Sequence, residues 1–245
     1  IAMALALWQS ESLSPKANFY YWLSFGFGCF AVGISWVHVS IDTFGGMPLI
    51  ASVGLMALLA LYLALYPALT GLALAWLTKT RSKNGETTFS LWRNLALFPA
   101  LWTLTEWARG WVMTGFPWLW AGYSQTQGPL KPLASIIGAL GLSFVLAMLA
   151  GALALCFTKR YKSLLLLLPL SILAVWAAPK LWEIHPTGEN VKVALVQGNI
   201  PQSMKWEPDA LWPTLLKYMD LSREHLDADI IIWPEAAIPA PESMV

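Results

Sequence analysis

The chain has 245 residues, of which 57% are hydrophobic and only 12% are charged, and its mean hydropathy is +0.57. A soluble domain usually has about 25% charged residues, so this composition excludes an ordinary soluble protein and favours a polytopic membrane protein. The formal net charge of +1 provides no bulk attraction for nucleic acid, and we expect no nucleic-acid partner.

Five long apolar segments are predicted to be complete membrane-spanning helices, preceded by a partial one at the N-terminus. Each has about 20 or more residues, the length that crosses a hydrocarbon core. The second is longer, so it must tilt, kink at Pro67 or extend beyond the membrane. Residues 1–185 are therefore expected to form a transmembrane helical domain. The five segments are Phe19–Val39, Met47–Leu77, Trp92–Trp111, Leu130–Phe157 and Ser163–Trp182.

The placement of basic residues predicts the orientation of these helices. Lysines and arginines gather in the connection Thr78–Leu91 and near Thr158, whereas the loops Ser40–Gly46 and Val112–Gly128 contain none. Basic connections face the cytoplasm. Counting crossings from that side, the chain after Trp182 is expected outside the cytoplasmic membrane.

Two features stand out in the membrane part. Glu106 and Arg109 lie three residues apart and share a helix face, so we interpret them as a structural ion pair in preference to a site for a lipid headgroup. The outer loop from Thr114 to Tyr123 is rich in aromatic residues, including Trp118. It is interpreted either as an anchor at the membrane surface or as a wall that guides an acyl chain into a site.

The last sixty residues follow a strand–helix–strand pattern. A strand over 190–201 is closed by Gly and Pro, and a helix is expected to begin between Pro208 and Pro213. The run Ile230–Ile232 lacks polar alternation, so it predicts a central strand covered on both faces. A crossover helix between two strands implies a parallel pair. Gln197 and Glu235 are then expected at the same edge of the sheet, where open α/β folds place their chemistry.

The sequence gives no support for a metal or a cofactor. His38, His185 and His225 are far apart and lack thiolate partners, so no metal site and no cofactor are expected. Cys29 and Cys156 fall inside apolar segments and are interpreted as inert packing residues rather than a disulfide or a nucleophile.

Several motifs together resemble the bacterial apolipoprotein N-acyltransferases, membrane-bound members of the nitrilase (carbon–nitrogen hydrolase) superfamily. The likeness extends over nearly the whole chain, and the motifs occur in the right order. They are Thr43-Phe-Gly-Gly-Met-Pro48, Thr105-Glu-Trp-Ala-Arg-Gly-Trp111, Thr114-Gly-Phe-Pro-Trp118, Gly122-Tyr-Ser-Gln125, Val196-Gln-Gly-Asn-Ile-Pro-Gln-Ser-Met-Lys-Trp206 and Ile231-Ile-Trp-Pro-Glu-Ala-Ala-Ile-Pro239.

The resemblance implies a fold and a reaction. Residues 186–245 would be the first part of an extracytoplasmic α/β nitrilase-like domain, an α-β-β-α sandwich on the periplasmic side of the bacterial inner membrane. The family transfers an acyl chain from a membrane phospholipid to the α-amine of a diacylglyceryl-cysteine apolipoprotein. It does so by a ping-pong mechanism through a thioester on a cysteine. In the family's Glu, Lys, Cys set, Glu235 matches the general base.

The resemblance also sets expectations for the other residues. Trp118 and Trp206 are candidates for arms that line the path of the lipid, and Gln197 is a further candidate for substrate binding. The family's Lys and Cys lie well downstream of Trp-Pro-Glu, and Lys205 is in the wrong motif to be that lysine. The chain is therefore expected to be truncated early in the nitrilase-like domain, and inactive by itself.

Two other functions remain open. A membrane-anchored nitrilase-type amidase would share Glu235 but would release a free acid and would not need an aromatic loop at headgroup depth. A transporter or scaffold with a binding tail would need polar residues and broken helices within its spans, and these spans are poor in charge apart from Glu106 and Arg109.

Overall fold

The computed structural model describes residues 1–79, 91–158, 162–181, 188, 190–235 and 237–239. It divides into two compact units, Ile1–Glu183 and Ile184–Val245, and each is described by itself. That these units are a transmembrane domain and an extracytoplasmic domain remains a prediction. The basic connections 80–90 and 159–161, Trp182, His185 and Ala236 lie outside the described residues.

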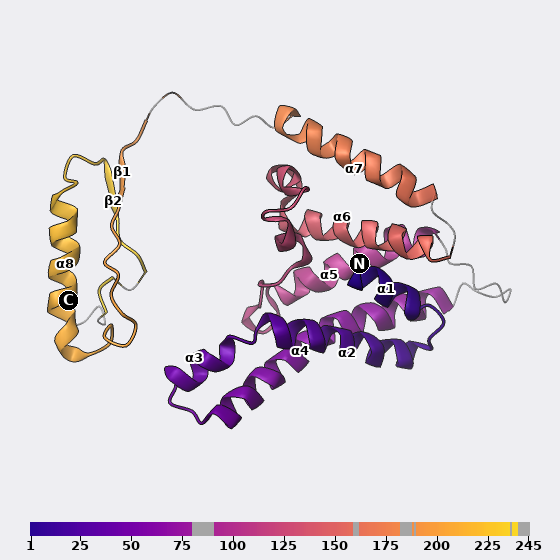
Figure 1. Ribbon diagram of the computed structural model, residues 1–245, viewed down its shortest axis with the longest axis horizontal. Helices are drawn as coiled ribbons and strands as arrows, with labels where there is room; N and C mark the ends of the chain where they lie inside the picture. Colours follow the sequence, from indigo (N-terminus) through magenta and orange to yellow (C-terminus); the bar gives the residue numbers. More distant parts are fainter. Residues whose placement is uncertain (80–90, 159–161, 182–187, 189, 236, 240–245) are drawn as a thin grey trace. The chain divides into compact units, whose positions relative to one another are not determined.

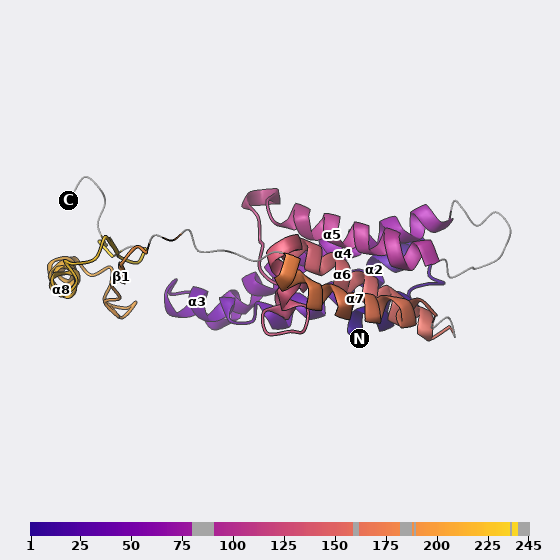
Figure 2. The same cartoon turned by 90° about the horizontal axis from the view of Figure 1, so that it is seen from above.

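The first unit is a bundle of helices. Consecutive long helices run in opposite directions in Figure 1, and Figure 2 shows them aligned along a common direction. Each of the five predicted segments is mainly helical, with shifted ends and with the first divided between α2 and α3, so their helical structure is confirmed. The α-helices of this unit are α1 (Ala2–Gln9), α2 (Pro15–Gly33), α3 (Val37–Thr43), α4 (Leu49–Lys79), α5 (Phe98–Arg109), α6 (Ala134–Cys156) and α7 (Lys162–Leu181).

The helices differ in how well they suit a membrane. Within the described residues, Leu49–Thr78 and Lys131–Cys156 are long and apolar enough to cross one. The expected span Phe19–Val39 is not one straight helix: α2 ends at Gly33, and α3 continues at an angle of 52°. If this bent pair is counted as one span, it adds a third; the apolar stretch of α7, Leu164–Lys180, is shorter. The number of five complete spans stays a prediction.

Small residues allow α2 and α4 to pack closely. The helix α2 begins cleanly because Ser14 accepts a hydrogen bond from the Ala17 amide and Pro15 occupies the first position. A Cβ on Gly71 would come within 2.2 Å of the buried Trp22 side chain, so glycine is needed there for contact. Although Pro67 lies inside α4, the helix continues through it.

A π-helical turn at Arg93–Leu97 leads into α5. In this turn the Phe98 amide donates a hydrogen bond to the Arg93 carbonyl, five residues back rather than the four of an α-helix. The buried Asn94 lies in this turn, and a Cβ on Gly151 of α6 would be 1.9 Å from the Asn94 carbonyl oxygen. The backbones of the π-turn and α6 therefore meet directly at Gly151.

The second unit contains the predicted strand–helix–strand. The strands β1 (Val193–Leu195) and β2 (Ile230–Ile232) pair in parallel, and α8 (Leu211–Arg223) lies between them in sequence. The parallel pair is therefore confirmed. The helix buries Thr214, Tyr218 and Ser222.

The expectation that the Ile230–Ile232 strand is covered on both faces is wrong for the described residues. Ile231 packs against a small core that includes Tyr218, but Ile230 and Ile232 are 48% and 47% exposed. A sheet has two faces, and among the described residues α8 covers only one of them. The apolar run Ile230–Ile232 predicted that a second layer covers the other face, and the described residues do not provide one.

Candidate functional site

Gln197 and Glu235 follow the carboxyl ends of the two parallel strands. Leu195 pairs in register with Ile232, so the segments after them leave the sheet at the same edge. Both Gln197 and Glu235 are exposed. The edge therefore presents an amide and a carboxylate to solvent, as expected from the sequence.

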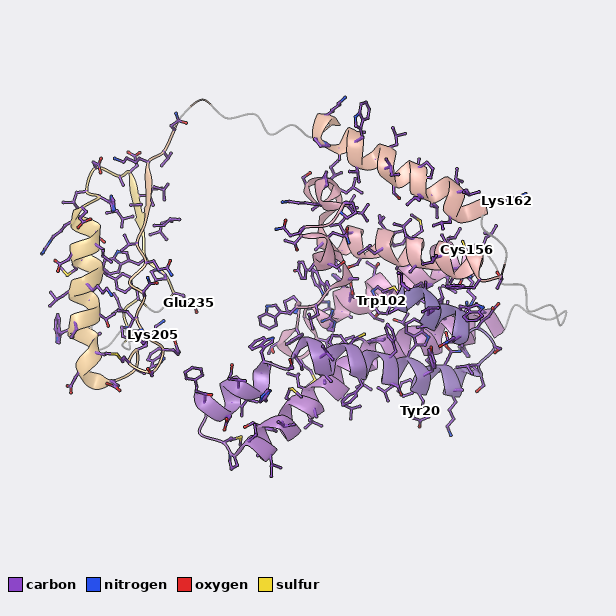
Figure 3. The ribbon with its side chains drawn as sticks, in the orientation of Figure 1. Tyr20, Trp102, Cys156, Lys162, Lys205 and Glu235 are labelled. Atoms are coloured by element: carbon purple, nitrogen blue, oxygen red, sulfur yellow. The ribbon has the colours of Figure 1, made fainter. Side chains whose placement is uncertain are left out.

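A second segment lies against Glu235. Lys205 donates a hydrogen bond of 3.4 Å from Nζ to the backbone carbonyl of Glu235, and Figure 3 labels both residues. The neighbouring Trp206 is 63% exposed. The structure thus brings the segment that carries Trp206 to the chain segment of Glu235, while the catalytic and binding roles of these residues remain predictions.

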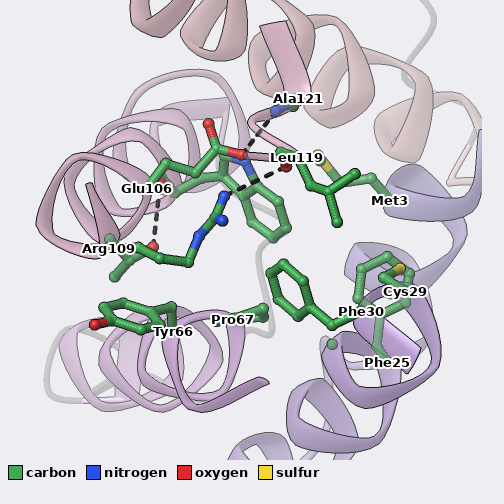
Figure 4. A pocket seen from close by; sticks show the side chains of 13 residues that line it. Met3, Phe25, Cys29, Phe30, Tyr66, Pro67, Glu106, Arg109, Leu119 and Ala121 are labelled. Carbon is green, nitrogen blue, oxygen red and sulfur yellow. Dashed lines mark hydrogen bonds between the residues drawn. The ribbon is translucent and has the colours of Figure 1, made fainter. Parts of the chain in front are cut away.

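The second candidate region is a cavity of about 240 Å³ within the first unit. Its walls are mostly apolar and come from α2, α4 and α5, and Glu106 and Arg109 lie at one side (Figure 4). Above them passes the segment 113–121, here called the aromatic loop. The lining residues are Met3, Phe25, Gly26, Cys29, Phe30, Tyr66, Pro67, Trp102, Thr105, Glu106, Arg109, Leu119 and Ala121.

The expectation of an ion pair between Glu106 and Arg109 is wrong. The described residues contain no salt bridge between these two side chains. Arg109 instead donates to the carbonyl oxygens of Phe116 (2.9 Å), Trp118 (2.5 Å) and Leu119 (3.3 Å). Glu106 Oε1 accepts from the Ala121 amide at 2.8 Å. Both side chains are buried, and each hydrogen-bonds to backbone groups of the aromatic loop; the two attract each other without direct contact.

Trp118 combines a fixed backbone with an exposed ring. Its carbonyl is held by Arg109, while its side chain is 59% exposed. The ring packs edge-on against Phe116, with centroids 4.9 Å apart. The next residue, Leu119, turns back and lines the cavity. The loop therefore presents one aromatic side chain outward and one aliphatic side chain inward.

Ser143 completes the loop's attachment and was not singled out from the sequence. Its hydroxyl accepts a hydrogen bond of 2.8 Å from the Gly122 amide, and the serine is fully buried in α6. A Cβ on Gly122 would be 2.0 Å from the Ala139 carbonyl oxygen, so the chain passes close to α6 here. A serine in the middle of an otherwise apolar helix was the available signal.

In the described part of the chain, Glu106 Oε2 and Trp102 Nε1 make no hydrogen bond of regular geometry. Their side chains, both in the cavity lining, lie one helical turn apart on α5 and interact with each other. Cys29, also in the lining, and Cys156 are free thiols carried by α2 and α6. Among the described residues, no group of three or more His, Cys, Asp or Glu side chains could hold a metal ion.

Comparison of the sequence with known proteins shows what this chain is similar to. The profile for the apolipoprotein N-acyltransferase N-terminal domain matches residues 1–152. The chain is 82% identical over 245 residues to the apolipoprotein N-acyltransferase of Shewanella oneidensis, covering 100% of this chain and 46% of that protein. It is 49% identical to the Vibrio cholerae protein of the same name (98% and 46% covered) and 38% identical to that of Pseudomonas syringae pv. tomato (98% and 47%). The chain thus spans about half the length of the curated relatives it matches.

Proposed function

Because the chain belongs to the apolipoprotein N-acyltransferase family, we propose that it is part of an enzyme that acylates lipoproteins. The enzyme takes an acyl chain from a membrane phospholipid and transfers it to the α-amine of a diacylglyceryl-cysteine apolipoprotein. The observation that carries this proposal is the 82% identity to a protein of that name along the entire chain. The apolar helices supply the membrane setting in which both lipid substrates are found.

The reaction proceeds in two steps through a thioester on a cysteine of the full-length protein. Glu235 takes the proton of that thiol, which raises its nucleophilicity, and gives the proton to the lysophospholipid that leaves as the thioester forms. It later takes a proton from the attacking amine, and the cysteine thiol leaves as the amide forms. The exposed carboxylate at the carboxyl edge of β1 and β2 supports this role, since a base must be reachable by both substrates. Gln197, at the same edge, offers an amide for hydrogen bonds to substrate.

The membrane orientation is part of the proposal. Residues 1–185 lie in the bacterial inner membrane, and residues 186–245 begin an α/β nitrilase-like domain on the periplasmic side. The parallel strands with their crossover helix support the α/β assignment. The absence of Lys and Arg from the loops Ser40–Gly46 and Val112–Gly128 supports an outward-facing aromatic loop.

The proposal is tested by incubating the purified full-length protein with a phospholipid that carries a labelled acyl chain. Formation of a labelled, hydroxylamine-sensitive acyl-enzyme, and its transfer to a diacylglyceryl-cysteine peptide, are the expected results. If the label is released as free acid while the peptide stays unmodified, the protein hydrolyses the acyl donor and is not a transferase. If the protein takes up no label, the transferase function is refuted.

Trp118 and Trp206 line the path of the acyl donor in this scheme. Both rings are well exposed, so removing them does not disturb a core. Trp118→Ala and Trp206→Ala are each expected to raise KM for phospholipid or to slow acylation by about tenfold, as loss of about 1.4 kcal/mol of binding would do. Trp212→Ala on α8, where the ring is 68% exposed, is the matched control and should leave both steps unchanged. Wild-type KM and acylation rate in both test variants would indicate that these tryptophans only anchor the protein at the membrane surface.

A further inference from the structure

The backbone of the aromatic loop is strained. Met113, Thr114 and Leu119 all have positive φ angles, of 52°, 73° and 61°. Residues with a side chain rarely adopt this conformation, and a β-branched residue such as Thr114 does so least readily. Each such residue costs about 1–3 kcal/mol and persists only where surrounding contacts determine the conformation. Something must therefore hold this loop in place.

The contacts that hold the loop converge on Arg109. Its guanidinium binds three loop carbonyls, and its own carbonyl accepts a hydrogen bond of 2.7 Å from the Phe116 amide. The guanidinium is itself fixed, since Arg109 is 2% exposed and lies 5.0 Å from the centre of the Phe30 ring. Glu106 then holds the far end of the loop through Ala121. Arg109 and Glu106, which hold the loop between residues 116 and 121, thus both belong to α5.

These contacts surround Trp118 without covering its ring. Arg109 binds the carbonyl of Trp118 and those of residues 116 and 119 on either side of it. The backbone at Trp118 is consequently fixed, while the ring remains exposed for a ligand. A misplacement of about 1 Å at a group that aligns a substrate can cost about 100-fold in rate.

We propose that Arg109 is a positioning residue for acylation, which acts by holding the aromatic loop so that Trp118 meets the acyl donor. This inference rests on the proposed function. Arginine suits the task because its planar fork of five N–H donors reaches several carbonyls at once. Lysine would keep the charge but concentrate its donors at one point, so it cannot reproduce the three contacts.

The test compares Arg109→Lys, Trp118→Ala and the double variant in the full-length enzyme. The rate of acyl-enzyme formation is measured separately from the rate of transfer by pre-acylated enzyme. Arg109→Lys is expected to slow acylation by tenfold to a hundredfold and to leave transfer unchanged. The double variant should be no slower than the slower single variant, because both changes disable the same element. Lys131→Gln, which removes an exposed cation beyond the loop, is the control.

Three outcomes would overturn the inference: normal acylation in Arg109→Lys, additive losses in the double variant, or equal slowing of both half-reactions. The last would indicate a general loss of structure. Hydrogen exchange provides a readout that does not depend on activity. Arg109→Lys should speed exchange at the Phe116, Ala121 and Gly122 amides while that of α6 stays slow. If the wild-type enzyme forms no acyl-enzyme, the proposed function is refuted. If Arg109→Lys leaves hydrogen exchange at the loop amides unchanged, the positioning role is refuted.

Discussion

Glu235→Gln in the full-length enzyme is expected to lower the rate of acyl-enzyme formation by about 10²–10⁴-fold, the usual contribution of a general base. Glutamine has nearly the same size and shape but cannot take the proton from the thiol. The side chain is exposed at the carboxyl edge of the sheet, so the free energy of unfolding should not change. The measurement is trapping of the labelled thioester over time, together with thermal unfolding of the same preparation.

A matched control is available in the same unit. Glu224 is an exposed carboxylate just after α8, and Glu224→Gln removes the same charge without touching the edge. It should acylate at the wild-type rate. Acylation by Glu235→Gln within a few-fold of wild type would show that Glu235 is only a solvated carboxylate at a strand end.

Gly151→Ala is expected to lower the stability of the first unit strongly. The new Cβ would lie 1.9 Å from the Asn94 carbonyl oxygen, and a backbone atom cannot move aside as a flexible side chain does. The π-turn and α6 must then separate, which costs about 1–3 kcal/mol or more. Chemical unfolding of the purified protein in detergent, followed by circular dichroism, measures the free energy of unfolding.

The control for Gly151 is Gly54→Ala on α4. A Cβ there meets nothing within 4 Å, and Gly54 is helical, so alanine should be neutral or stabilise the helix by up to about 1 kcal/mol. Equal stability of the two variants would mean that α6 and the π-turn do not approach as closely as the structure shows.

The sequence predicted the main elements because their signals are local. Long apolar segments determine helices in lipid or in a tightly packed bundle, so the ranges of α4 and α6 could be placed within a few residues. The parallel pairing of β1 and β2 followed from the crossover helix between them. The exposed edge that carries Gln197 and Glu235 followed from that pairing alone.

Other features depended on partners that the sequence does not reveal. The spacing of Glu106 and Arg109 indicated a shared helix face, but their partners are loop backbone groups, brought close by positive φ angles at positions without glycine. No sequence pattern announces left-handed backbone at a threonine or a leucine. The interpretation of Ile230–Ile232 failed similarly, because burial on the second face depends on a layer that the described residues do not supply.

The π-turn at Arg93–Leu97 gives α5 an unusual tolerance to changes in chain length. A π-turn accommodates one residue more than a regular α-helical turn, so α5 can keep its phase when one residue is lost from the turn. Loss of one residue within the turn would restore regular winding and leave Glu106 and Arg109 facing the same loop. Loss of one residue between Phe98 and Glu106 would instead rotate both side chains by about 100° about the helix axis. The rotational setting of the loop's two anchors is therefore protected against a deletion on one side of Phe98 and sensitive to it on the other.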